Sequence, residues 1–272
     1  MMYQLLITRI TMKRMTYYFA VLVVLMSVAC TSKEQRKNIR NLTTNQADIT
    51  KVSIPDNMLT SAEVKDGWKL LFDGKTSAGW MNAKSKTFPT SGWEIKDGTL
   101  NVTPESGSGG DIVTTDKYRN FELIVDFKYK TGANSGIKYF IDTEINNGVL
   151  ASIGCEYQVI DNKYYNDSEL DISGKQNLAA LYDLIAPVNI KDNGPDNWNR
   201  ATIIVKGSHV QHWLNGQKTV EYERGTQAWR DLVATSKFKT SPGFGEVTEG
   251  RILLQEHGGA VSFKNIKIRE IK

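Results

Sequence analysis

The stretch FELIVDFKYK, residues 121–130 of this 272-residue chain, is the clearest indication of its fold. Every second residue from Phe121 to Tyr129 is apolar, and most of the residues between them are charged. A period of two is typical of a strand that presents one face to a core and the other toward water. The stretch therefore predicts a half-buried strand.

The sequence downstream repeats this pattern. The segments at 200–207 and 209–216 predict two strands that are joined by a turn at Gly207-Ser208. Asn215-Gly216 is a strong signal for a two-residue turn, so a further hairpin is expected to follow.

Two more segments, at 251–257 and 261–271, flank a glycine pair and predict a closing pair of strands. Only the stretch at 226–238 has a clear helical pattern, with Trp229 on its apolar face. Many short strands with turn signals and one short helix favour an all-β protein, an antiparallel β-sandwich. We expect this domain to occupy residues 66–272.

Residues 1–29 have the pattern of a secretory signal peptide. Met12-Lys13-Arg14 give a positive start, an apolar run follows, and SVAC at 27–30 forms a small-residue cleavage region that ends in Cys30. The apolar run is shorter than the roughly 20 residues of a membrane span. SVAC resembles a bacterial lipobox, with Ser27 where Leu is usual, and this resemblance implies lipidation of Cys30. An ordinary secretory leader is the alternative.

The segment between this leader and the domain is polar. Residues 30–65 are therefore expected to form a tether between a lipid anchor and the folded part. These features predict a protein that is secreted across the inner membrane and held in the cell envelope as a lipoprotein, in the periplasm or at the outer membrane.

Charge and cysteine content exclude two other classes of protein. The formal charge of +4 includes Arg9, Lys13 and Arg14 of the leader, which leaves +1 for the rest of the chain. No basic stripe appears in the expected domain, so nucleic-acid binding is not expected. Beyond Cys30 the only cysteine is Cys155, which is expected to be a buried packing residue without a disulfide partner.

Eight motifs follow one another between residues 71 and 268, and as an ordered set they are far more specific than any single one. They are LFDGKTSAGW (71–80), GWEIKDGTLNV (92–102), DIVTTDKYRNFELIVDFKY (111–129), NSGIKYF (134–140), CEYQVID (155–161), WNRATIIVKG (198–207), HWLNG (212–216) and ILLQEHGGAVSFKNIKI (252–268). A chain with this set resembles the 3-keto-disaccharide hydrolase family.

The resemblance implies a concanavalin A-like jelly roll with a ligand groove on its concave face. It also implies a carbohydrate substrate, a glycoside whose sugar ring carries a ketone at C3. A separate dehydrogenase is then expected to supply the keto sugar. Within the resemblance, residues 161–190 form a variable segment on the substrate side.

The motif CEYQVID combines a strand pattern with polar residues. As a strand, it places Glu156 and Gln158 on one face, and Tyr157, Val159 and Asp161 on the other. A carboxylate and an amide side by side suit a sugar, because a sugar presents paired hydroxyl groups.

The same alternation puts Gln255 and His257 together, just before the glycine pair, and places Lys138 on one face of the NSGIKYF strand. The family fold implies that these residues line one groove with Glu156 and Gln158. Tyr182 and Asp161 are expected at the substrate as well.

A ketone at C3 makes the hydrogen on C2 acidic, so that a base can remove it and the resulting enolate can expel the group on C1. Glu156 or His257 is the expected base, Lys138 the charge partner of the enolate, and Gln158 and Gln255 the orienting groups. This chemistry requires no cofactor. The sequence has no closely spaced His and Cys residues of the kind that bind a metal ion, so no metal site is expected.

Two other functions remain open from the sequence. An ordinary glycoside hydrolase would use two carboxylates, here Glu156 and Asp161, but the usual middle acid of the corresponding strand pattern is replaced by Gln158. A non-catalytic carbohydrate-binding module would use tryptophans as a stacking platform, and the candidates are Trp68, Trp80, Trp93, Trp198, Trp213 and Trp229. Trp68, Trp80 and Trp93 lie where core tryptophans are more common.

Overall fold

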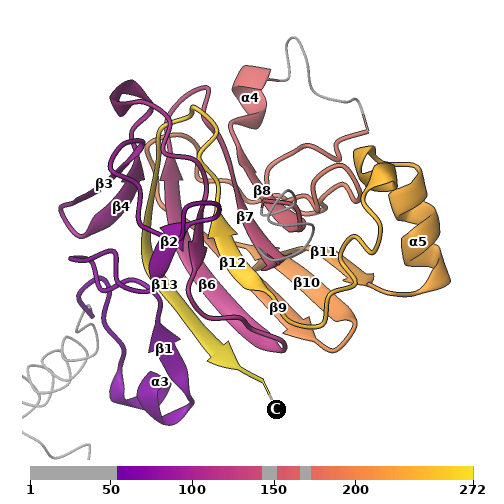
Figure 1. Cartoon of the computed structure of the whole chain (residues 1–272), viewed down its shortest axis with the longest axis horizontal. Helices are drawn as coiled ribbons and strands as arrows, with labels where there is room; N and C mark the ends of the chain where they lie inside the picture. The colour runs from indigo at the N-terminus through magenta and orange to yellow at the C-terminus, as the bar shows by residue number, and fades with distance from the viewer. Residues whose placement is uncertain (1–53, 143–151, 166–172, 272) are drawn as a thin grey trace, which may run out of the picture. The chain divides into compact units, whose positions relative to one another are not determined.

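The computed structural model describes residues 54–142, 152–165 and 173–271, which belong to a compact unit that begins at Ile54. Two antiparallel sheets build this unit (Figure 1). The first has the order β11-β10-β9-β6-β13-β4-β3 with β1 also paired to β13, and the second has the order β2-β5-β12-β7-β8.

The strands of the first sheet are β1 (Trp68–Leu70), β3 (Trp93–Lys96), β4 (Thr99–Val102), β6 (Phe121–Tyr129), β9 (Asn199–Lys206), β10 (His209–Leu214), β11 (Gln217–Glu223) and β13 (Val261–Glu270). Those of the second are β2 (Trp80–Asn82), β5 (Ile112–Thr114), β7 (Asn134–Ile141), β8 (Cys155–Ile160) and β12 (Arg251–Leu254). The helices are α3 (Ser61–Lys65), α4 (Asn162–Tyr165) and α5 (Gln227–Ala234), with 3-10 turns η1 (Pro104–Ser106) and η3 (Lys237–Thr240).

The core lies between the two sheets, as the alternating pattern predicts. Phe121, Leu123 and Phe127 of β6 are fully buried in one cluster with Ile137 of β7 and Tyr157 of β8. The predicted hairpins β9-β10 and β10-β11 are present, the second with a bulge between His212 and Trp213. The predicted fold class, an antiparallel sandwich of the concanavalin A-like jelly-roll type, is confirmed.

The helices are short and lie at the margins of the sheets. α5 occupies the stretch with the helical pattern, and its Trp229 is buried against Phe244 and Tyr222. The sequence patterns did not predict α3 and α4, which have five and four residues and are too short to show a period. No helix within the described ranges is long and apolar enough to span a bilayer.

The domain begins before residue 66, which corrects the predicted boundary of the tether. Asn57 is buried, and its N–H donates to Asn265 Oδ1 at 2.6 Å while the N–H of Asn265 donates to Asn57 Oδ1 at 2.8 Å. Asn265 sits at a bulge of β13 with a φ of 50°, a left-handed conformation that Asn tolerates. The sequence of residues 54–65 resembles a tether because polar side chains such as Asn57, and not apolar ones, attach this segment to the domain. Cys30 and the rest of the tether lie outside the described residues.

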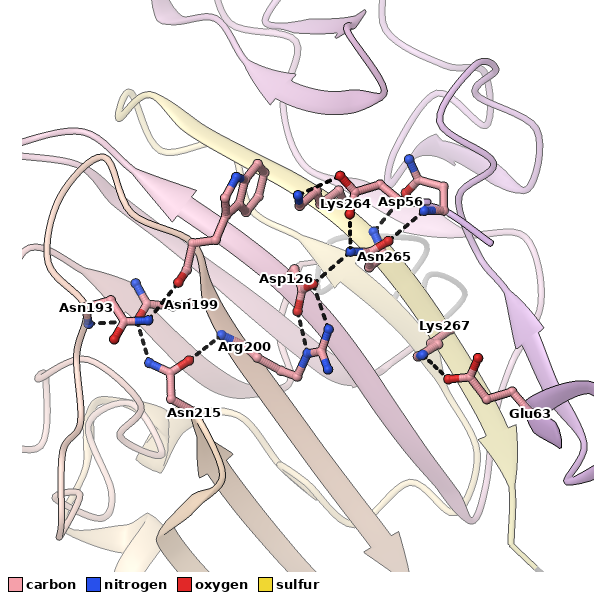
Figure 2. A network of polar contacts seen from close by, with 12 residues as sticks. Asp56, Glu63, Asp126, Asn193, Asn199, Arg200, Asn215, Lys264, Asn265 and Lys267 are labelled. Carbon is pink, nitrogen blue, oxygen red and sulfur yellow. Dashed lines mark hydrogen bonds and ion pairs between the residues drawn. The ribbon is translucent and has the colours of Figure 1, made fainter. Parts of the chain in front are cut away.

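The same network joins three strands of the first sheet (Figure 2). Arg200 of β9 donates to Asp126 of β6 through Nε at 2.6 Å and Nη2 at 2.9 Å, and Asn265 Nδ2 donates to the same carboxylate at 2.8 Å. Asn199 Oδ1 accepts from the side chain of Asn215. The polar side chains of Asn199 and Arg200, at the start of β9, therefore connect strands and loops.

A buried polar cluster connects the two sheets. Tyr139 of β7 contacts His212 Nε2 at 2.7 Å and the hydroxyl of Tyr222 at 2.8 Å. Cys155 is buried beside them without a disulfide, as predicted, and burial raises the pKa of its thiol to about 11. Burial also lowers the pKa of His212 to about 3, so this imidazole is neutral in the folded protein at neutral pH.

His212 should make the fold sensitive to acid. Its pKa is about 3 in the folded state against 6.5 for an ordinary histidine, so the unfolded chain binds more protons between these values. The stability that the neutral ring contributes is complete above pH 6.5 and is lost as pH falls. Between pH 7 and pH 5 we expect a loss of about 2 kcal/mol in the free energy of unfolding from this group.

Urea unfolding of the wild type and of His212→Gln at both pH values measures this contribution. The variant should lose less stability than the wild type on acidification, whatever its stability at pH 7. An equal loss in the two proteins would show that His212 does not carry the effect.

Candidate active site

Strand β8 is buried on both faces, and this resolves the mixed character of its sequence. Tyr157 points into the core, while the other face carries Glu156 and Gln158, only 6% and 2% exposed. The free edge of β8 is covered by residues 179–182. Gln158 N–H donates to the Ala180 carbonyl at 3.2 Å, and Tyr182 N–H donates to the Glu156 carbonyl at 3.0 Å.

The strand register arranges this face in two neighbouring rows. Lys138 is paired with both Leu253 and Glu156 across the strands. The bridge between Tyr157 and Leu181 puts Tyr182 opposite Glu156, so Tyr182 extends this first row.

In the second row, Gly136 is paired with Gln158 and accepts the N–H of Gln255 at 2.9 Å. Gln255 therefore lies on the same face as Gln158 and Lys138, as predicted. Asp111, which accepts the N–H of Glu256 at 3.0 Å, continues this row on the far side of Gln255. The sequence analysis did not select Asp111.

A buried ion pair lies at the centre of the two rows. Lys138 Nζ is 3.6 Å from Glu156 Oε2, and it donates to the Ser152 carbonyl at 3.3 Å. Both side chains are at least nine-tenths buried. Glu156 Oε1 lies over Gly136, where a Cβ atom would stand only 2.2 Å from it. The glycine in the NSGIKYF motif therefore makes room for the carboxylate.

Burial decides the acidity of Glu156. Loss of water raises the pKa of this carboxyl above its ordinary value, with a further increase from the nearby charge of Asp111. The positive charges of Lys138 and Lys237 oppose this increase. A carboxylate with a raised pKa is a stronger base than one in water, which is the property that a general base needs.

Lys237 is a site residue that the sequence analysis missed. It lies in η3, and its Nζ is 3.9 Å from the centroid of the Tyr182 ring. Its N–H donates to Asp183 Oδ2 at 2.7 Å. No local pattern could have identified it, because Glu156 and Lys237 are far apart in the sequence, with strands β9 to β11 and helices α4 and α5 between them.

Two predicted residues do not join this group. Asp161 Oδ2 accepts the N–H of Gly132 at 3.0 Å, and Oδ1 accepts those of Lys163 and Tyr164 of α4 at 3.2 and 3.3 Å, so both of its oxygens bind backbone groups. His257 is exposed, in the turn beyond the end of β12. The alternation that suggested a shared face holds only as far as the strand pairing, which ends near Gln255.

No group of three or more His, Cys, Asp or Glu residues within the described ranges could hold a metal ion. The expectation that the site works without a metal stays a prediction.

Comparisons with known proteins identify the family. The model of the 3-keto-alpha-glucoside-1,2-lyase-like domain matches residues 67–269. The chain is 36% identical to a 3-keto-disaccharide hydrolase of Bacteroides thetaiotaomicron over 230 residues, 75% of this chain and 78% of that one. A solved structure from Parabacteroides distasonis, described as a candidate glycosyl hydrolase, has a TM-score of 0.72 and 31% identity, covering 80% of this chain and 100% of that one.

A second candidate glycosyl hydrolase from Parabacteroides distasonis has a TM-score of 0.54 and 27% identity, covering 75% of this chain and 99% of that one. The fold and these relatives place the chain in the class of glycoside-hydrolase-like β-sandwich enzymes. Within that class, the chain belongs to the 3-keto-alpha-glucoside-1,2-lyase-like domain family, and it is an enzyme of the glycoside hydrolase type.

Gly136→Ala tests the packing of the carboxylate. The added methyl group would collide with Glu156 Oε1 and with the carboxyl carbon at 2.9 Å, so the side chain must move. We expect a loss of activity of about 100-fold, because a displacement of 1 Å at a reacting group has this order of effect. The comparison of kcat in the wild type, Gly136→Ala, Glu156→Gln and the double variant measures it.

If the glycine acts through Glu156, the double variant should be no worse than Glu156→Gln alone. Full additivity of the two losses would contradict this account, and so would an active Gly136→Ala enzyme. Thermal melts of all four proteins distinguish a displaced side chain from an unfolded domain.

Proposed function

We propose that this enzyme hydrolyses the glycosidic bond of 3-keto-disaccharides and related 3-keto-glycosides by elimination followed by hydration. The observation that carries the proposal is the buried carboxylate of Glu156, held beside a lysine and with its pKa raised by burial. The similar enzyme of Bacteroides thetaiotaomicron is a 3-keto-disaccharide hydrolase. The family description names a 1,2-lyase, which supports an elimination that removes the C2 hydrogen and the group on C1.

The reaction begins with transfer of the C2 proton to the carboxylate of Glu156. The electron pair of the C2–H bond forms a C2=C3 double bond, and the C3 oxygen becomes an enolate. When the carbonyl at C3 re-forms, C1=C2 becomes the double bond, and the C1–O bond breaks with its electrons on the leaving oxygen, which takes up a proton. Water then adds to C1 and a proton returns to C2, so the net reaction is hydrolysis.

The residues around Glu156 suit this base. Lys138 holds one carboxylate oxygen, and Gln158, in the amide orientation that satisfies both of its ends, donates to Glu156 Oε1 at 3.3 Å and to the Ser135 carbonyl at 3.2 Å. Gln255 stands beside Gln158 on the same face, where it can orient sugar hydroxyl groups. His257 is less suited to be the base because it lies in an exposed turn.

The two alternatives find less support. The second carboxylate of an ordinary glycoside hydrolase would be Asp161, whose oxygens are occupied by backbone N–H groups. A tryptophan platform for a binding module would need exposed rings, whereas Trp68, Trp80, Trp93 and Trp229 are buried. Trp198 and Trp213 are only partly exposed, and the ammonium groups of Lys128 and Lys264 lie over the Trp198 ring. Neither arrangement explains the buried lysine–glutamate pair.

The direct test offers the purified protein a disaccharide oxidised at C3 and its unoxidised parent, and measures the release of monosaccharides. We expect cleavage of the keto sugar alone, because only the ketone makes C2 acidic. Glu156→Gln should lower kcat by about 100- to 10,000-fold, the usual contribution of a general base. Equal cleavage of the two sugars, or an active Glu156→Gln enzyme, would refute the mechanism.

We further propose that Cys30 carries a lipid that holds the enzyme in the cell envelope, and that a separate dehydrogenase supplies the keto sugar. The motif SVAC supports the first statement, and the oxidation state of the substrate supports the second. Expression of the wild type and of Cys30→Ala tests the anchor. The wild type should be found in the membrane fraction with a lipid-modified Cys30 by mass spectrometry, and the variant should be soluble and equally active. An unmodified, soluble wild type would contradict the anchor.

A further inference from the structure

Two lysines flank Glu156, and their surroundings differ. Lys138 is 8% exposed and has its ammonium group between Glu156 Oε2 and the Ser152 carbonyl. Lys237 is exposed, and within the described ranges no carboxylate lies within ion-pair distance of its Nζ. One positive charge is therefore engaged with the carboxylate, and the other remains available to a ligand.

Lys237 is held in place by its neighbours. Asp183 has a left-handed backbone with a φ of 62°, and its carboxylate accepts the N–H of Lys237. Tyr182, the preceding residue, lies opposite Glu156 and supports the ammonium group of Lys237 on its ring. Backbone conformations of this kind cost free energy and concentrate at functional sites.

The charge of Lys237 reaches the same space as the carboxylate. Partial loss of water lowers the pKa of Lys237, and the charge of Glu156 opposes this decrease. The charge of Lys237 in turn opposes the rise in the pKa of Glu156 that burial causes. Lys237 is exposed, and the Tyr182 ring that supports its ammonium group extends the row of Glu156. The ammonium group is therefore placed to contact substrate atoms next to the carbon that Glu156 deprotonates.

We propose that Lys237 is the catalytic cation that contacts the C3 oxygen and stabilises the enolate, and that Lys138 is a positioning residue for Glu156. This inference rests on the proposed function, and it replaces the expectation from the sequence that Lys138 is the charge partner of the enolate. The proton moves from C2 to Glu156, and the negative charge that appears on the C3 oxygen faces the ammonium group of Lys237. A fixed charge of this kind contributes most when the charge on the substrate develops.

Two readouts on the full protein test the proposal: the release of monosaccharide from a 3-keto-disaccharide, and the exchange of the C2 hydrogen of 3-keto-glucose in D₂O, followed by NMR. The variants are Lys237→Met, Lys237→Arg and Lys138→Met. Lys239→Met is the matched control, because Lys239 is an exposed lysine of the same 3-10 turn.

Lys237→Met should lose about 100- to 1,000-fold in kcat and a similar factor in C2 exchange, with a small change in KM. Lys237→Arg should recover part of both rates, and Lys239→Met should match the wild type. The loss in Lys237→Met should persist at the pH optimum. In Lys138→Met, the acid limb of the pH profile of kcat/KM should move to higher pH, because loss of a positive charge raises the pKa of Glu156.

The outcomes separate the two levels of the account. If the wild type cleaves the sugar and exchanges C2 while Lys237→Met does both at the same rate, the assignment of Lys237 is refuted and the proposed function stands. If Lys237→Met loses cleavage but keeps C2 exchange, Lys237 acts on the leaving group and the assignment is again refuted. If the wild type neither exchanges C2 nor cleaves the keto sugar, both proposals fall.

Discussion

The burial of Glu156 against Lys138 is the constraint on which the rest of the site depends. Taking a carboxylate and an ammonium group out of water costs several kcal/mol per ion, and their attraction does not reliably offset this cost. A sheet that needed only stability would place apolar residues on this face of β8, as it does nearby with Val113 and Leu253. The charged pair therefore points to chemistry at this position.

The architecture around the pair supplies what the burial requires. Gly136 leaves space over its Cα for the carboxylate, and the segment at 179–182 covers the edge of β8 with backbone hydrogen bonds. The same segment brings Tyr182 beside Glu156 and, through Asp183, fixes the backbone of Lys237. Lys138 and Glu156 thus come from the sheet, while the 3-10 turn η3 contributes the more exposed cation, Lys237.

Much of the fold could be predicted from the sequence, because alternation along β6 and the turn at Asn215-Gly216 are local signals. The shared face of Glu156 and Gln158 was also predicted, since the alternation of a strand fixes which of its side chains share a face, and the family resemblance placed Lys138 with them. The alternation stops where a strand ends, and this is why His257 was grouped with Gln255 although it lies in a turn beyond β12. Asp161 was already on the opposite face from Glu156 by the same alternation, and its carboxylate accepts backbone N–H groups instead of joining the site.

Other parts of the site and the fold depend on long-range contacts that no local pattern records. Lys237 reaches the site only through long-range contacts: residues 179–182 pair with the edge of β8, and the ammonium group of Lys237 lies over the Tyr182 ring. Asn57 looked like part of a polar tether because its hydrogen bonds to Asn265 at the bulge of β13 replace the usual apolar anchor. In both cases the decisive interactions join residues far apart in the sequence.

The acidity of Glu156 is the property that most directly tests this account. An NMR titration of the protein labelled with ¹³C at the glutamate side-chain carboxyls, with Glu156→Gln to assign the resonance, measures it without any substrate. The account predicts an apparent pKa above the ordinary value of 4.5, because the loss of water outweighs the two lysines. A pKa at or below that value would contradict it, since the carboxylate would then be a weak base held by an ion pair.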